Sequence, residues 1–158
     1  MSMQRPVAAA RRLETMLGAP YLPGGQAPRP AEEALAPFKA GLEGELEPGD
    51  LARCEAFGAA RALFEGRYYW EAHDVFEAVW IRLPPASAER MLVAGLIQLA
   101  NAGLKGRMGK PGAARRILAL ADRALGEAAR RLPGGGHGLP AVEVAALRRQ
   151  AAREEAQE

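Results

Sequence analysis

Apolar residues recur every three or four positions over most of the chain, whereas the two-residue alternation typical of strands is almost absent. The pattern predicts an all-α protein, a small helical bundle of antiparallel helix hairpins. Helices are expected over residues 6–17, 31–46 with an interruption near Pro37, 51–65, 67–83, 88–108, 111–132 and from Pro140 onward. Gly18 and Gly66 are expected to end two of these helices, and Asp50 and Ser87 to cap two others.

Proline and glycine divide the chain into three expected parts. Residues 1–49 hold an N-terminal helix and a Pro/Gly-rich arm, because "GAPYLPGGQAPRP" at positions 18–30 cannot form regular structure. Residues 50–132 are the expected core helical bundle. Residues 133–158 are a Gly-rich break followed by a charged C-terminal helix.

Two glycine turns, at Gly66 and Gly109, each stand between two expected helices. The arrangement is loosely tetratricopeptide-like, although the turns are 43 residues apart and that repeat has a period of about 34. We therefore interpret the pattern as two packed helical hairpins rather than as a repeat array.

Composition is consistent with one compact domain, since 158 residues with 49% hydrophobic content can bury a single core. Cys54 is the only cysteine, which excludes a disulfide within the chain and favours a cytoplasmic location. No apolar run approaches the length of a membrane span, so we expect no association with a membrane.

The net charge of +2 is unevenly distributed, because residues 105–131 carry eight basic side chains against Asp122 and Glu127, a local charge of +6. Arg116, Arg123 and Arg130 are seven residues apart on one helix face, with no aromatic residues between them. Such a stripe attracts phosphate backbones without reading bases. We do not expect nucleic acid to be the partner, and a homodimer or a protein partner is the working hypothesis.

The expected helix 67–83 carries the densest candidate chemistry. At 100° per residue, one side holds Trp70, His73, Asp74, Glu77, Trp80 and Ile81, and the other holds Ala72, Val75, Phe76 and Val79. A helix that is apolar on both sides is expected to be largely buried. Its charged groups must then be paired.

Partners for these groups are expected on the next helix, where a polar stripe contains Arg90, Ala94, Gln98, Asn101 and Lys105. Arg90 is predicted to pair with Glu77, and Gln98 and Asn101 to hydrogen-bond His73. The predicted polar network or ligand pocket comprises Trp70, Glu71, His73, Asp74, Glu77, Trp80, Arg90, Gln98 and Asn101. On this hypothesis the protein is a binding or interaction module with a buried His/Glu/Arg/Gln network.

The alternative hypothesis is a metal-dependent hydrolase. His73 and Glu77 stand at i and i+4, a spacing that lets two side chains hold one divalent ion, with Asp74 and Glu71 as neighbouring carboxylates. The count of ligands opposes it, because the only other histidine, His137, lies in the Gly-rich break. The chain also has no Glu-x-x-His pair, phosphate-binding loop or nucleophile elbow. The sequence therefore specifies neither a reaction nor a cofactor.

The segments "FEGRYYWEAHDVFEAVW", "GLIQLANA" and "GKPGAARRIL", with Arg90 between the first two, resemble the family catalogued as domain of unknown function 309, over roughly positions 57–120. The motif positions are Gly66, Trp70, Glu71, His73, Glu77, Trp80, Arg90, Gln98, Gly109, Gly112 and Ala113. The resemblance implies an all-helical bundle and no established activity. The chain departs from the family pattern at Leu104 and Lys105, where a histidine is typical, and at Lys110, which replaces an asparagine. The missing histidine weakens the hypothesis of a shared metal site.

Overall fold

The structure is a computed structural model that describes residues 12–132 and 138–156. All regular elements of this described part are helices, which confirms the all-α prediction. They are α2 (Glu32–Leu35), the 3-10 helices η1 (Ala36–Lys39) and η2 (Pro48–Arg53), α3 (Glu55–Glu65), α4 (Tyr69–Trp80), α5 (Ala88–Arg107), α6 (Pro111–Arg131) and α7 (Ala141–Ala156). Residues 12–17 are also helical.

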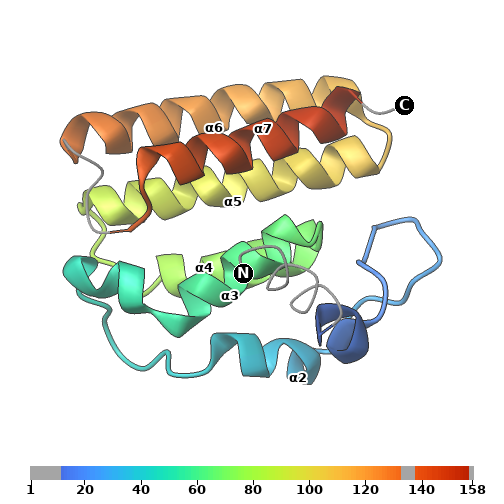
Figure 1. Cartoon of the computed structure of the whole chain (residues 1–158), viewed down its shortest axis with the longest axis horizontal. Helices are drawn as coiled ribbons and strands as arrows, with labels where there is room; N and C mark the ends of the chain where they lie inside the picture. The colour runs from blue at the N-terminus through green and yellow to red at the C-terminus, as the bar shows by residue number, and fades with distance from the viewer. Residues whose placement is uncertain (1–11, 133–137, 157–158) are drawn as a thin grey trace, which may run out of the picture.

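Helix α5 is the central element of the bundle (Figure 1). It contacts α4 on one side and both α6 and α7 on the other, and α3 packs against α4. Gly109, with φ of 72°, makes the short turn that joins α5 to α6. The finer expectation of tetratricopeptide-like hairpins stays a prediction.

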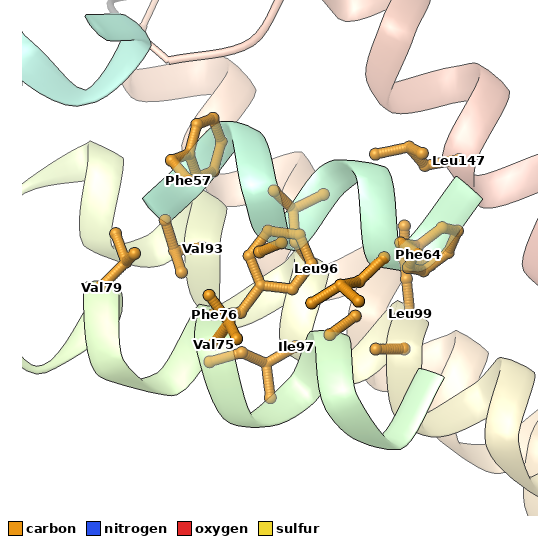
Figure 2. Close-up of a cluster of buried hydrophobic side chains, with 14 of the residues drawn as sticks. Phe57, Phe64, Val75, Phe76, Val79, Val93, Leu96, Ile97, Leu99 and Leu147 are labelled. Atoms are coloured by element: carbon orange, nitrogen blue, oxygen red, sulfur yellow. The ribbon is translucent and has the colours of Figure 1, made fainter. Parts of the chain in front are cut away.

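The core contains large apolar side chains from several helices (Figure 2). Phe57 of α3 and Phe76 of α4 meet with ring centroids 6.0 Å apart, and α5 contributes Leu96 and Leu99. The same buried cluster contains Leu35 and Phe38 from the expected N-terminal part and Leu139 and Leu147 from the expected C-terminal part. The division into three parts is a prediction that this packing does not test.

Several helix ends lie where the sequence places them. Gly18, with φ of 71°, follows a helix that ends at Leu17, and Gly66 caps α3. The Ser87 side chain accepts a hydrogen bond from the Arg90 N–H at 3.1 Å and so caps α5. Pro111 begins α6, where its missing N–H is not needed. The expected start of the first helix at Pro6, and the break that contains His137, lie outside the described residues.

Two expectations in the first third of the chain are wrong. The predicted helix 31–46 ends with η1 at Lys39, and positive φ angles at Gly41 and Gly44 prevent its continuation. Asp50 does not cap α3, because it lies inside η2 and pairs with Arg53, and the N-cap of α3 is Cys54.

Helix α4 is shorter than predicted at both ends. It begins at Tyr69 rather than Arg67 because Arg67 adopts a positive φ of 70°, which breaks the helical path after Gly66. The strain of a left-handed arginine is offset by its guanidinium group, whose Nε and Nη2 donate to Glu154 at 3.0 and 2.7 Å. The Arg67 side chain therefore links the turn between α3 and α4 to α7.

Tyr69 joins three helices in the core. Its ring fills the space beside Gly103 of α5, where a Cβ would lie 2.7 Å from the ring, and it packs edge-on against Phe64 of α3. Its hydroxyl accepts a hydrogen bond from Gln150 of α7 at 3.0 Å. Burial raises the pKa of Tyr69 to about 12, which keeps the phenol neutral.

In the described part of the chain, no helix combines the length and the apolar character needed to cross a membrane.

Candidate functional site

Only one side of α4 is fully buried. Ala72, Val75, Phe76 and Val79 are buried as predicted. On the opposite side the Glu77 side chain is 53% exposed and Ile81 is 67% exposed. The rest of that side, with Trp70, His73, Asp74 and Trp80, is half-buried, because α3 and α5 both pack against the apolar side.

The three predicted metal ligands do not meet at one point, because only His73 and Glu77 approach each other. His73 Nδ1 lies 3.7 Å from Glu77 Oε2, near the surface, whereas Asp74 pairs with Lys39 of η1 at 2.6 Å. Among the described residues there is no group of three or more histidine, cysteine, aspartate or glutamate side chains placed to hold a metal ion. The geometry therefore gives no support to a metal centre on α4.

Arg90 does not reach Glu77, which contradicts the predicted ion pair. Its guanidinium group lies 3.9 Å from the centre of the Trp80 ring, and Nη1 donates to the Leu83 carbonyl at 2.9 Å. Gln98 and Asn101 are half-buried on α5, and within the described chain neither hydrogen-bonds His73. The predicted pairing of Arg90 with Glu77 is therefore wrong, because Arg90 lies beside the C-terminal turn of α4 and is held there by Trp80 and the Leu83 carbonyl.

Glu71 is the buried acid of this helix, with no exposed surface. Its Oε2 accepts a hydrogen bond from the Tyr21 N–H at 3.0 Å, whereas its Oε1 is buried without a partner. Burial raises the pKa of the Glu71 carboxyl group. The sequence offered a signal for this position, since Glu71 stands four residues before Val75 and one before Ala72, on the apolar side.

The arm before α2 supplies contacts that sequence patterns do not indicate. The Tyr21 ring lies 5.1 Å from the Trp70 ring, and the Arg29 guanidinium lies 5.2 Å from the centre of the same ring. The Tyr68 hydroxyl donates to the Gly18 carbonyl at 2.6 Å. The arm therefore covers the first turn of α4.

Replacing Glu71 with glutamine is expected to stabilise the fold more at pH 7 than at pH 4. Because burial raises the folded-state pKa of this acid above its unfolded value, its charged form destabilises the fold above the folded-state pKa. That cost disappears as the pH falls below the pKa of Glu71 in the unfolded state, because the carboxyl group is then protonated in both the folded and the unfolded protein. Urea unfolding of both proteins from pH 4 to pH 7 measures the difference, with Glu65→Gln on the exposed surface of α3 as the control. A difference in unfolding free energy that is independent of pH would contradict the assignment.

A second feature is a groove between the C-terminal half of α6 and the N-terminal half of α7, with a volume of about 710 Å³. We call it the α6–α7 groove. Its lining includes the buried Leu92 and Leu139, then Leu125, Gly126 and Ala129 on α6, and Val144, Ala145, Arg148 and Arg149 on α7.

One end of the groove is marked by an ion pair between the two helices. Arg148 Nε and Nη2 donate to the two carboxylate oxygens of Asp122 at 3.1 and 3.0 Å. Sequence patterns do not predict this groove, since small residues on a helix face are as consistent with close packing as with open space.

Comparison with known proteins agrees with the resemblance seen in the sequence. The model of a family described as a domain of unknown function (DUF309) matches residues 57–117. No curated protein and no solved structure matches the chain. The matched segment runs from α3 into the first turns of α6 and contains Trp70, Glu71 and Arg90. The helical core of this chain is therefore similar to the DUF309 family.

Proposed function

We propose that the protein is a helical binding module that takes a small amphipathic anion, with an aliphatic tail and a carboxylate head, in the α6–α7 groove. The observation that carries the proposal is an apolar opening of about 710 Å³ between two helices, a volume within the range of ligand pockets.

The lining of the groove suits an aliphatic tail. Leu92 and Leu139 are only 5% and 3% exposed, and Leu125 and Val144 form half-buried apolar walls. Between them stand residues with little or no side chain, such as Gly126. An aliphatic chain placed here would lose its contact with water over most of its length, which is the driving force for apolar binding.

The charges at the groove favour an anionic head. The charged residues that line the groove are Arg148, Arg149 and Asp122, so the lining has an excess of positive charge. Arg148 is engaged by Asp122, whereas Arg149 is exposed on α7. An arginine at the rim of an apolar groove provides paired N–H donors for a carboxylate.

The alternative hypothesis of a metal-dependent hydrolase has less support. It requires Glu71, His73, Asp74 and Glu77 to act together, but Asp74 pairs with Lys39 and Glu71 is buried beneath the arm.

Calorimetric titration with dodecanoate tests the proposal, and saturable binding at one site is expected. Gly126→Leu should weaken binding at least about ten-fold by filling the groove. A Cβ at Gly126 meets only the end of the Arg130 side chain, at 3.6 Å, so the added side chain begins without a clash against the backbone. Gly112→Leu makes the same change on α6 outside the groove and should leave the affinity unchanged.

The head group is tested separately. Arg149→Glu should weaken dodecanoate binding, and dodecyltrimethylammonium, with the opposite charge, should bind less tightly than dodecanoate. Absence of binding, or equal affinity in the Gly126→Leu protein, would refute the proposal. Binding of an apolar helical peptide but not of dodecanoate would assign the groove to a protein partner instead.

A further inference from the structure

The first turn of α4 contains a buried acid that the arm satisfies only in part. The Tyr21 N–H donates to Glu71 Oε2 at 3.0 Å. Glu71 Oε1 is buried and accepts no hydrogen bond from any described residue. A buried acceptor without a donor is costly, and a carboxylate can accept several hydrogen bonds. This oxygen therefore has unused capacity for a donor.

The neighbouring Trp70 already holds a cation. The Arg29 guanidinium lies over its ring at 5.2 Å, and the Tyr21 ring packs against the same indole at 5.1 Å. A guanidinium stacks on an aromatic face in this way through cation–π attraction. Arg29 forms no ion pair with Glu71 within the described chain, so its guanidinium contacts the Trp70 ring but not the Glu71 carboxylate.

One ligand chemistry would satisfy both groups. A guanidinium is planar, stacks on aromatic rings and presents paired N–H donors that match a carboxylate. We propose that Trp70 and Glu71 form a binding site for the guanidinium group of an arginine side chain in a partner peptide. The arm at residues 18–30, with Arg29 over the ring, occupies this place when the partner is absent.

The arm is suited to such an exchange. Its residues 18–30 form no helix or strand, and Arg29 itself is exposed. Its contacts to α4 and to the residue before α4 come from the Tyr21 N–H, from the Tyr21 ring and the Arg29 guanidinium on Trp70, and from the Gly18 carbonyl that accepts from Tyr68. Leu22 packs against the core but is only half-buried. Segments with few buried contacts open at low free-energy cost.

Titration of the Trp80→Phe protein with N-acetyl-arginine amide tests the inference, because fluorescence then reports on Trp70 alone. We expect a saturable change with this probe, a weaker one with N-acetyl-lysine amide, and none with the uncharged N-acetyl-citrulline amide. Arg29→Ala removes the competing side chain and should tighten binding about two- to five-fold, as expected for loss of an exposed cation–π contact.

Glu71→Gln should weaken binding at least ten-fold, since it removes the charge and retains the acceptor for Tyr21. Arg123→Ala, which makes the same substitution as Arg29→Ala but on the exposed face of α6, should have no effect. An equal response to the citrulline probe, unchanged affinity in the Glu71→Gln protein, or no saturation in the Arg29→Ala protein would overturn the inference. The site is independent of the α6–α7 groove, so either assignment can fail without the other.

Discussion

Gly106→Ala is expected to lower the free energy of unfolding by about 3 kcal/mol, toward the upper end of the cost of overpacking. A Cβ at Gly106 would lie 2.6 Å from the carbonyl carbon and 2.7 Å from the carbonyl oxygen of Glu154. These are backbone atoms of α7, so the helix as a whole must move. The α6–α7 groove depends on the position of α7, and dodecanoate binding should weaken with it. Urea unfolding and hydrogen exchange of the α7 amides measure both effects.

The matched control is Gly58→Ala in α3. Gly58 is exposed and a Cβ there meets nothing within 4 Å, so alanine should stabilise that helix by about 1 kcal/mol. If Gly106→Ala were as stable as the wild type, the close approach of α5 and α7 would be wrong.

Phe76→Ala is expected to destabilise the protein by about 4 kcal/mol. Phe76 is fully buried at the centre of the core cluster and packs against Phe57 (Figure 2). Its truncation removes the transfer free energy of the ring and leaves a cavity between α3, α4 and α5. Chemical unfolding monitored by far-UV circular dichroism measures the change.

Leu120→Ala provides the comparison, because Leu120 is 48% exposed on α6. It should change the stability by less than about 0.5 kcal/mol. A loss below about 1 kcal/mol for Phe76→Ala would contradict the position of this residue in the core.

The elements that could be predicted from the sequence are those governed by local rules. Ser87 capped a helix and Gly66 ended one because each end is determined by residues next to it in the chain. The apolar face of α4, with Val75 and Phe76, followed from helical periodicity alone. The limits of α4 depended on the left-handed Arg67, whose conformation is supported by Glu154, 87 residues later.

The arrangement of the site residues could not be predicted because it depends on contacts distant in the sequence. Helical spacing placed His73 and Glu77 on one face but gave no account of Lys39, which pairs with Asp74. Arg90 was expected near Glu77, whereas its position beside Trp80 and the Leu83 carbonyl depends on the turn between α4 and α5. The arm covers Glu71 through a hydrogen bond from Tyr21, which lies 50 positions earlier in the chain.

Backbone amide NMR shifts during titration with dodecanoate test the central claim most directly. We predict that the largest shifts occur at Gly126, Ala129, Val144 and Ala145, which line the α6–α7 groove, and that Gly126→Leu abolishes them. Residues of α4 should be unaffected. Saturable shifts located on α4 or the arm, or no saturable shifts at all, would contradict the account of a binding module whose ligand lies between α6 and α7.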